Sequence, residues 1–255
     1  MKTKEQNLQR LVTILITNYN YGRFIQNAVL SAAQQTYSPI GLIIVDDGST
    51  DNSKEVIESL ISGHNNRFVD FKTLHLEKNV GINASLNRGI PLIEGDITII
   101  LDADDMLKPP YVEETTSILL KNETQGVGFV YTDNVLIDEK GNVLRDKYGK
   151  EVRLPWQDFD AELLKTKSYI PGCAATLTHV LKSALPFDES IKIHTKHPRL
   201  RKIVEIGGYR GIRIPKQLVY YRMHGDNNSG IGIPVIEAVA SGKPVGGISD
   251  YWKPV

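Results

Sequence analysis

Short apolar segments alternate along this sequence with segments of helical periodicity, and no other feature restricts the possible folds as strongly. Residues 11–16, 42–45 and 97–101 are nearly continuous apolar runs rich in β-branched side chains. Such runs are typical of strands that are buried on both faces of a parallel sheet. Residues 25–32 instead carry apolar side chains at helical spacing. Because βαβ crossovers are right-handed, this alternation predicts an α/β fold: a Rossmann-like, mostly parallel sheet with helices on both faces.

The remaining segments extend this pattern and then loosen it. The further predicted elements are a helix over 51–61 that Asp51 and Asn52 cap, a weaker strand over 68–76, a helix over 82–90, strands over 127–131 and 134–137, and a hairpin turn at 138–142. Residues 150–226 mix short strands and helices. The sequence therefore predicts a parallel α/β half followed by a smaller α+β region.

Composition narrows the functional classes. The 255 residues include 30 basic and 30 acidic side chains, so broad electrostatic capture of nucleic acid is disfavoured and no nucleic-acid partner is expected. Cys173 is the single cysteine, which excludes an intrachain disulfide and favours a reducing compartment. Neither a secretory signal nor an apolar run of about 20 residues is recognisable. We expect a cytoplasmic protein, and peripheral association with a membrane surface stays open.

Polar side chains follow three of the predicted strands, at residues 17–20, 46–49 and 102–105. The carboxyl ends of parallel strands meet at one edge of a sheet, where ligands bind. Two acidic clusters at one edge repel each other unless a cation or the donors of a ligand compensate their charge. Aspartates spaced as Asp102 and Asp104 suit a hard divalent cation such as Mg²⁺ or Mn²⁺, which in turn neutralises a diphosphate as a Lewis acid. The sequence therefore predicts a metal–diphosphate site at this edge.

Two other classes of nucleotide-binding protein are disfavoured by motifs that the sequence lacks. It has no Gly-x-x-x-x-Gly-Lys-Ser/Thr loop, which argues against a P-loop nucleotidase. No Gly-x-Gly-x-x-Gly follows the first predicted strand, which argues against a dinucleotide oxidoreductase.

An ordered set of motifs resembles the family-2 glycosyltransferases of the GT-A fold over about residues 10–228. The matching segments are VTILITNYN (12–20), IVDDGSTD (44–51), NVG (79–81) with NRG (87–89), LDADD (101–105), FDES (187–190) and LVYYRMH (218–224). The resemblance implies transfer of a sugar, with inversion, from a nucleoside-diphosphate sugar, most often a UDP-sugar. The acceptor is expected to be a glycan, a lipid or a protein, as in polysaccharide biosynthesis. It also implies that residues 150–226 form the acceptor side.

The resemblance assigns roles to individual residues by position. Thr17 and Tyr19 would border the base, with a packing role as the alternative for Tyr19, and Asp47 would accept from the imide N–H of the base. Asn79 would shape the nucleotide pocket or start a helix. Asp102 and Ala103 would lie near the ribose and diphosphate, Asp104 would bind Mn²⁺ or Mg²⁺ directly, and Asp105 would cap the next turn. His224 matches a histidine that reaches the metal or diphosphate in some relatives, with a purely structural role as the alternative. Pro171, Gly172 and Cys173 match a loop of the donor-sugar and acceptor cleft.

One departure from the family pattern concerns the catalytic base. Inverting members place an aspartate after the Phe-Asp-Glu-Ser stretch, and that position here is Lys196. A lysine of ordinary pKa is protonated near neutrality and cannot act as the base. His197, or His194, has a suitable pKa, and His197 is the candidate catalytic residue. The alternative hypothesis is a catalytically weak or inactive nucleotide-sugar-binding module of a multi-domain transferase.

Two further interpretations complete the sequence-based account. A nucleotidyltransferase is a third possibility, although residues 18–23 are a poor substitute for the Gly-rich basic loop of such enzymes. Residues 232–245 resemble the nucleotide-sugar-binding helix start of GT-B glycosyltransferases, in which the residue matching Glu237 contacts the ribose. About 25 residues cannot form a second Rossmann-like lobe. We therefore expect a GT-A domain over residues 1–228 and, over 229–255, an extension that resembles a fragment of a second transferase domain.

Overall fold

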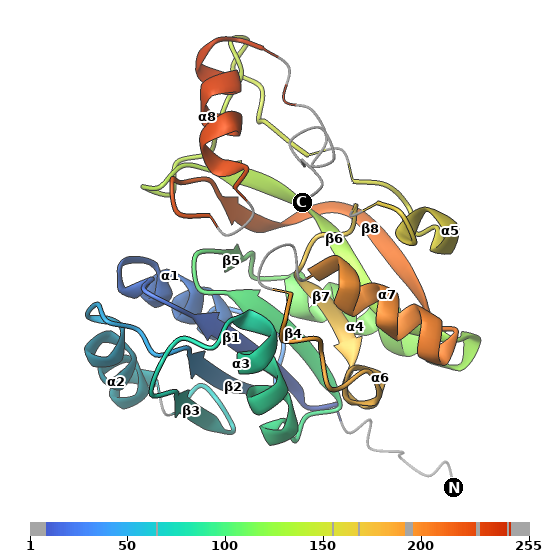
Figure 1. The fold of residues 1–255 in the computed structure, drawn as a ribbon. Helices are drawn as coiled ribbons and strands as arrows, with labels where there is room; N and C mark the ends of the chain where they lie inside the picture. Colours follow the sequence, from blue (N-terminus) through green and yellow to red (C-terminus); the bar gives the residue numbers. More distant parts are fainter. Residues whose placement is uncertain are drawn as a thin grey trace, which may run out of the picture.

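A mixed sheet in the order β3-β2-β1-β4-β7-β6-β8-β5 connects the two halves of the molecule (Figure 1). The computed structural model describes residues 9–64, 66–154, 156–167, 169–191, 196–227, 230–243 and 245. The strands are β1 (Val12–Asn18), β2 (Ile40–Asp46), β3 (Phe71–His75), β4 (Ile97–Asp102), β5 (Met106–Leu107), β6 (Val127–Ile137), β7 (Ala174–Leu177) and β8 (Arg210–Arg222). The helices are α1 (Gly22–Ala33), α2 (Ser53–His64), α3 (Ile82–Gly89), α4 (Tyr111–Asn122), α5 (Ala161–Leu164), α6 (Thr178–Ser183), α7 (Lys196–Gly207) and α8 (Gly232–Ala240), with 3₁₀ turns η1 (Ile90–Leu92) and η2 (Glu123–Gln125).

The first half of the sheet is the predicted parallel unit. Strands β3, β2, β1 and β4 pair in parallel, and every residue of β2 is buried. The side chains of these strands form the main hydrophobic core with the inner faces of α1 and α3. Helix α2 begins at Ser53, whose N–H donates to Asp51 at 3.0 Å, so the predicted aspartate cap is present. The predicted α/β class and its parallel sheet are confirmed.

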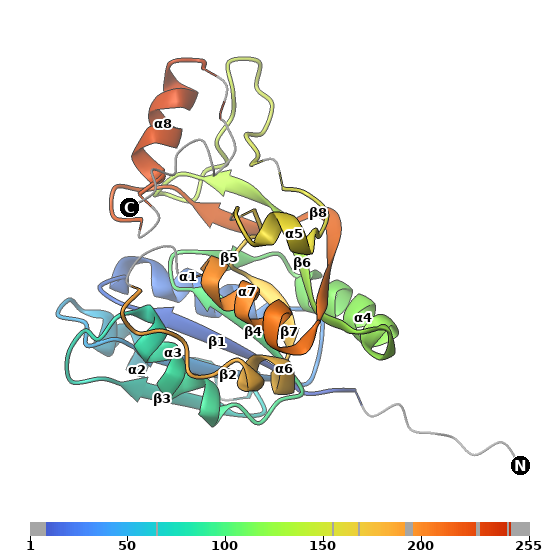
Figure 2. The same cartoon turned by 45° about the vertical axis from the view of Figure 1, so that its right-hand side comes forward.

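Helices cover both faces of this sheet, as predicted. Helices α1, α2 and α4 lie on one face, and α3, α6 and α7 lie on the other (Figures 1 and 2). The connections explain this division. Strands β1, β2 and β3 succeed each other in one direction along the sheet, whereas α3 leads back from β3 to β4. Right-handed crossovers place helices that travel in opposite directions on opposite faces.

The second half of the sheet differs from the prediction in the length of its strands. Two short strands were expected at 127–137, but β6 is continuous over this range, and β8 runs for 13 residues beside it. Polar side chains inside β6 obscured this continuity, and two of them have partners on other segments. Asp133 accepts two hydrogen bonds from Arg213 at 2.7 and 2.8 Å, and Asn134 accepts one from the Trp156 indole at 2.8 Å. Register shifts at Asp133 accommodate the irregularity.

The far ends of β6 and β8 rise from the main sheet and carry a second, smaller core. Leu136, Trp156, Met223 and Val235 belong to this cluster, so α8 packs on side chains from both long strands and from the segment that follows β6. The predicted hairpin turn is present, since Asp138 N–H donates to the carbonyl of Asn142 at 2.8 Å. In Figures 1 and 2 this region forms the upper lobe, above the edge at which β1 and β4 end.

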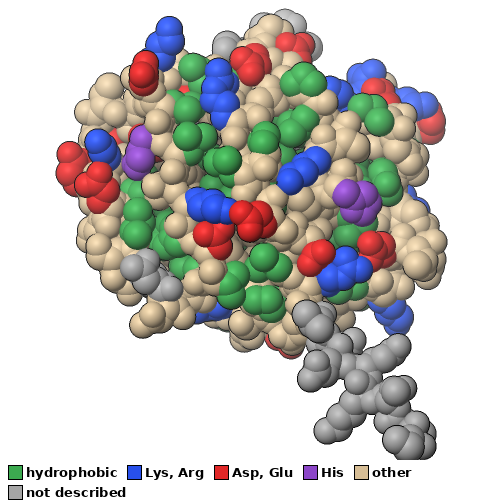
Figure 3. All heavy atoms as spheres, turned by 90° about the horizontal axis from the view of Figure 1, so that it is seen from below, with side chains coloured by type: hydrophobic (Ala, Val, Ile, Leu, Met, Phe, Trp, Pro, Cys, Tyr) green, Lys and Arg blue, Asp and Glu red, His purple; other side chains and the backbone are tan. Residues whose placement is uncertain are grey.

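Two surface properties bear on possible partners. On the face shown in Figure 3, described acidic and basic side chains are interspersed and no large region of one sign is visible. None of the described helices is long and apolar enough to span a bilayer.

Candidate functional site

The polar strand ends predicted from the sequence meet at one edge of the parallel sheet. Strand β1 lies between β2 and β4, with Asn18 opposite Asp46 and Thr17 opposite Asp102. Hydrogen bonds continue this pairing just beyond the strands. The Asp47 N–H donates to Asn18 O at 2.8 Å, and the Ala103 N–H donates to Thr17 O at 3.1 Å. The acids that follow β2 and those that follow β4 are therefore held on either side of the end of β1.

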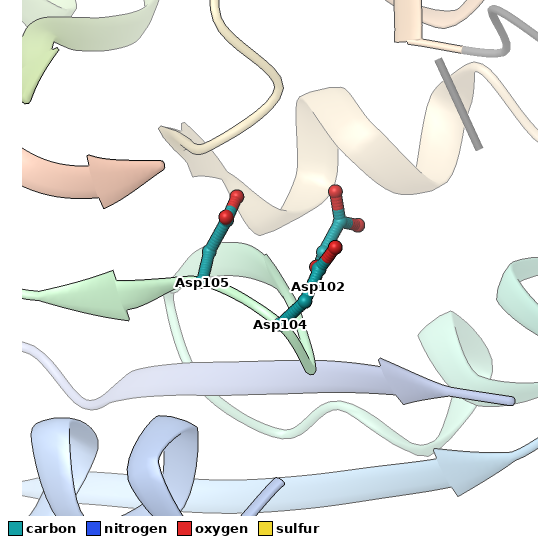
Figure 4. A group of neighbouring side chains, drawn as sticks. All are labelled: Asp102, Asp104 and Asp105. Atoms are coloured by element: carbon teal, nitrogen blue, oxygen red, sulfur yellow. The ribbon is translucent and has the colours of Figure 1, made fainter. Parts of the chain in front are cut away.

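Three carboxylates gather in the turn after β4. One oxygen each from Asp102, Asp104 and Asp105 lies within 4.8 Å of the others, and the side chains point to the same side of the turn (Figure 4). Asp104 and Asp105 are buried, at 6% and 5% exposure, whereas Asp102 is half-buried. Like charges this close and this buried repel each other unless a cation or neighbouring donors compensate them. Oxygen donors in this arrangement fit a divalent cation of the Mg²⁺ or Mn²⁺ type.

The chain returns to this turn immediately after β8. His224 Nε2 lies 3.1 Å from Asp104 Oδ2, and the Asn227 side-chain amide donates to the same oxygen at 3.3 Å. The other ring nitrogen of His224 accepts a hydrogen bond from the Asp226 N–H at 3.2 Å. A neutral imidazole that accepts at Nδ1 carries its proton on Nε2. In this arrangement His224 therefore donates to Asp104 and orients it, and its predicted role as a metal ligand stays a prediction.

Arg222 holds the acidic turn from within the protein. Its side chain is 1% exposed, its Nε donates to Asp104 O at 2.8 Å, and its backbone N–H donates to Asp105 Oδ1 at 3.0 Å. Its Nη1 donates to the carbonyl oxygens of Asp138 and Glu139 at 3.2 and 2.9 Å. Burial lowers the pKa of Arg222, and the charges of Asp105 and Asp104 oppose that shift. The capping of the following turn by Asp105 stays a prediction, and the structure adds the hydrogen bond from β8 to its carboxylate.

Aromatic side chains from the start of α1 enclose His224. The rings of Tyr21 and Phe24 lie 5.4 and 5.0 Å from the imidazole, between ring centroids. The Tyr21 hydroxyl donates to the Asp226 carbonyl at 2.7 Å. Burial, followed by the negative charge of Asp104, raises the pKa of Tyr21 well above its ordinary value. Tyr21 is therefore a hydroxyl donor throughout the neutral range, and it joins the β1–α1 loop to the segment after β8.

On the other side of β1, both acids of the 46–49 turn are engaged by the protein itself. Asp46 accepts from the Asn18 amide at 2.7 Å and from the Ser49 hydroxyl at 2.5 Å. The two oxygens of Asp47 accept from the N–H groups of Val80 and Gly81 at 2.8 and 2.9 Å. Asp47 is thus tied to the loop before α3, and each of its oxygens retains a second lone pair for a ligand. Gly81 has a φ of 91°, which side chains disfavour.

The remaining predicted residues are distributed unevenly around this edge. Tyr19 is 41% exposed and Thr17 is partly exposed at the end of β1, while Asn79 is exposed beside the loop that Asp47 holds. Ala103 is completely buried, so its methyl group faces the core rather than a ligand. Helix α7 begins at Lys196. The side chains of Lys196 and His197 lie outside the described residues, as does His194.

Sequence reasoning missed three participants: Tyr21, Arg222 and Asn227. The Tyr-Arg-x-His run containing Arg222 was used only as part of a motif, and nothing in a sequence indicates that an arginine is buried. Asn227 lies three residues after His224, where its side-chain oxygen accepts from the His224 N–H at 2.7 Å. A side chain that bonds the backbone three residues earlier is a common turn device, and this spacing was the available signal.

An α/β sheet with this strand order and an acidic turn after its fourth strand defines a GT-A, Rossmann-like transferase fold. Residues 13–184 match the family described as glycosyl transferase family 2. The chain belongs to that family.

Curated relatives carry the same similarity over most of the chain. A chondroitin synthase of Pasteurella multocida is 30% identical over 220 residues, which is 86% of this chain and 21% of that protein. An uncharacterized glycosyltransferase of Nostoc is 28% identical over 222 residues, or 85% of this chain and 66% of that protein. The chain thus spans about a fifth of the length of the Pasteurella relative.

Solved structures share the fold at low sequence identity. TarS of S. aureus in complex with UDP aligns with a TM-score of 0.64 and 16% identity, covering 86% of this chain and 62% of that chain. The mannosyltransferase PcManGT of Pyrobaculum calidifontis, in complex with GDP-Man and Mn²⁺, aligns with a TM-score of 0.61 and 18% identity, covering 86% and 58%. These likenesses establish the GT-A architecture. They match the predicted fold class.

Proposed function

We propose that this chain binds a nucleoside-diphosphate sugar, preferably a UDP-sugar, together with Mn²⁺ or Mg²⁺, and transfers the sugar to a glycan, lipid-linked or protein acceptor. One observation carries the proposal. The carboxylates of Asp102, Asp104 and Asp105 converge at the end of β4, beside the polar ends of β1 and β2. A divalent cation there would neutralise the diphosphate as it leaves the sugar.

We propose that the metal and diphosphate bind on the β4 side of β1 and that the base binds on the β2 side. Asp104 would bind the cation, with His224 as a second ligand or, through its hydrogen bond, as the group that orients Asp104. Asp102 and the backbone at Ala103 would lie beside the ribose and diphosphate. On the β2 side, the set proposed to surround the base is Thr17, Tyr19, Asp47 and Asn79.

A second candidate function is a nucleotide-sugar-binding module with little or no transfer activity of its own. Lys196 favours this candidate, because a protonated amine at the start of α7 cannot accept the proton of an acceptor hydroxyl. His197 is the residue that we propose as a substitute base if transfer occurs. In either case the donor site is the same, so the two candidates differ only in turnover.

The proposal includes a cellular setting and a domain plan. We propose a cytoplasmic location, with contact to a membrane surface through the acceptor or a partner. We also propose a GT-A domain over residues 1–228 with residues 229–255 as an appended segment, of which α8 packs on the second core.

The experiment that tests this proposal measures binding and turnover together. UDP-N-acetylglucosamine, UDP-glucose and GDP-mannose would each be titrated calorimetrically with Mn²⁺, and release of nucleoside diphosphate would be followed with and without acceptor saccharides. Metal-dependent binding with release supports the transferase, and metal-dependent binding without release supports the binding module. If no nucleotide sugar binds with either metal, both candidates are wrong.

A further inference from the structure

Arg199 is a buried cation that the site described above does not use. Its side chain, in the first turns of α7, is 5% exposed. Among the described residues, no group accepts a hydrogen bond from its Nη1. The Phe187 ring, with its centroid 5.8 Å from the guanidinium carbon, supplies only a weak cation–π contact. A buried N–H group without an acceptor is costly, so the free Nη1 of this arginine favours an anionic ligand.

Comparison with Arg222 emphasises how unusual this arrangement is. Both arginines are buried and each has one nitrogen without an acceptor among the described residues, Nη1 in Arg199 and Nη2 in Arg222. Arg222 nevertheless donates to three backbone carbonyl oxygens and fixes the turn that carries Asp104. Arg222 therefore has a structural role that explains its burial. No comparable set of acceptors surrounds Arg199 in the part of the chain that the structure describes. A bound anion would supply acceptors that the described residues do not offer to Nη1.

The surroundings of Arg199 indicate where that ligand lies. Burial lowers the pKa of Arg199 to about 10, and the charge of Asp102 is the one that opposes the shift. The guanidinium is therefore protonated at neutral pH. The carboxylate whose charge acts on it is Asp102, the half-buried member of the acidic triad. Arg199 belongs to α7, whereas Arg222 lies at the end of β8 and His224 follows that strand. Arg222 and His224 contact Asp104 and Asp105, and Asp102 is the member of the triad whose charge acts on Arg199.

We propose that Arg199 binds the diphosphate of the nucleotide sugar, on the Asp102 side of the metal site. This inference rests on the proposed function and adds a binding residue to it. A planar guanidinium offers a fork of donors that matches two phosphate oxygens, and it is the preferred cation for partly desolvated phosphate sites. Three carboxylates carry more negative charge than one divalent cation neutralises. Arg222 offsets part of that excess beside Asp104 and Asp105, and Arg199 adds positive charge on the Asp102 side, which makes the site attractive to a diphosphate.

The test compares UDP with uridine, which lacks the phosphates, in the presence of Mn²⁺. Both would be titrated by calorimetry into the unaltered chain, Arg199→Met and Arg201→Met. Arg201 is the matched control, because it lies on the same helix but is exposed and pairs with Glu205 at 2.6 Å. Loss of charge-assisted hydrogen bonds should weaken UDP binding by Arg199→Met about 10- to 100-fold. Uridine binding, and both ligands with Arg201→Met, should be unchanged.

A measurement without nucleotide separates a binding role from a structural one. Replacing a buried charge by an apolar side chain of similar size should leave the melting temperature of Arg199→Met unchanged or raise it. A lower melting temperature together with unchanged UDP affinity would overturn the inference, since it would assign Arg199 to the fold. If Arg199→Met does not fold, Arg199→Gln keeps a polar side chain in the same space, and it should lose UDP affinity to a similar degree.

Two other results would overturn the inference in distinguishable ways. Equal UDP affinity in the unaltered chain and both Arg199 variants would remove Arg199 from the donor site while leaving the proposed function intact. Loss of affinity for UDP-glucuronate alone, with UDP unaffected, would assign Arg199 to a sugar carboxylate instead of the diphosphate. Absence of UDP binding to the unaltered chain with any metal would reject the proposed function itself.

Discussion

The two halves of the sheet differ in how closely sequence and site are linked. In the parallel half, β1, β2 and β4 end in polar turns whose side chains bond to neighbouring turns, as Asp47 does with Val80 and Gly81. In the other half, the long strand β8 supplies Arg222 and leads to His224, which reach back to the turn after β4. The first half thus provides a donor site from local motifs, and the second half completes it through contacts that join residues more than 100 positions apart.

Donor binding and sugar transfer are proposed to depend on different parts of the molecule. The acids after β2 and β4 fit a metal–diphosphate site, whereas α7 begins with Lys196 where the family pattern calls for an aspartate. The account therefore predicts a competent donor side combined with a weakened acceptor side. Four experiments test that contrast, in order of expected effect.

The largest effect is expected from Lys196→Asp. Restoring a carboxylate should raise the rate of sugar transfer roughly 10²- to 10⁴-fold, because general-base catalysis contributes that range. Release of UDP from a UDP-sugar in the presence of acceptor measures the rate. Lys165→Asp is the control, because Lys165 is an exposed residue at the C-terminal cap of α5. This substitution should leave the rate of transfer unchanged. Faster transfer by the unaltered chain than by Lys196→Asp would contradict the account.

Asp104→Ala should remove metal binding from the donor site in the parallel half of the sheet. Because loss of groups that merely support metal ligands costs about 10- to 100-fold in affinity, removal of a ligand should cost at least about 100-fold in Mn²⁺-dependent UDP binding. Titration of UDP at fixed Mn²⁺ measures this. Asp158→Ala, with a side chain 91% exposed, serves as the control. If UDP affinity and its metal dependence survive in Asp104→Ala, the cation lies elsewhere.

Asp47→Ala tests whether the proposed nucleobase-binding side of the site also stabilises the fold. It removes two partly buried hydrogen bonds that backbone N–H groups donate to the carboxylate, so we expect a loss of about 3 kcal/mol in the free energy of unfolding. Urea denaturation measures the loss. An unchanged midpoint with weakened UDP binding would mean that Asp47 serves the ligand alone.

Tyr21→Phe has the smallest expected effect. It removes one hydrogen bond to the Asp226 carbonyl and retains the ring against His224, so the free energy of unfolding should fall by about 1 kcal/mol. The raised pKa of Tyr21 adds a pH dependence. A pKa that is higher in the folded state gives stability that is present below about pH 10 and is lost as the pH rises further. Alkaline denaturation should therefore be less steep in Tyr21→Phe, and identical curves would contradict this assignment.

The sequence predicted the parallel half of the fold because its information is local. Apolar runs and helical periodicity are properties of a few neighbouring residues, and β1, β2 and β4 begin and end within two residues of their predicted bounds. Strand β8 was not predicted over its full length. Its polar residues, such as Arg213, find their partners on β6, where Asp133 accepts from Arg213, and this pairing is not a local property of the sequence.

The site divides in the same way. The acids at 102–105 were recognisable because they follow a buried strand, and sheet topology alone brings strand ends together. The burial of Arg222 and Arg199 depends on how β8 and α7 pack, which no local pattern encodes. The hydrogen bond from Asn227 to Asp104 likewise joins residues that lie 123 positions apart in the sequence.

The central claim is that acids at neighbouring strand ends hold a divalent cation that binds a diphosphate. Its most direct test is a calorimetric titration of the unaltered chain with UDP, once with Mn²⁺ and once with a chelator in its place. The account predicts tight binding with Mn²⁺ and at least about 10-fold weaker binding without it. Equal affinity under the two conditions would contradict it.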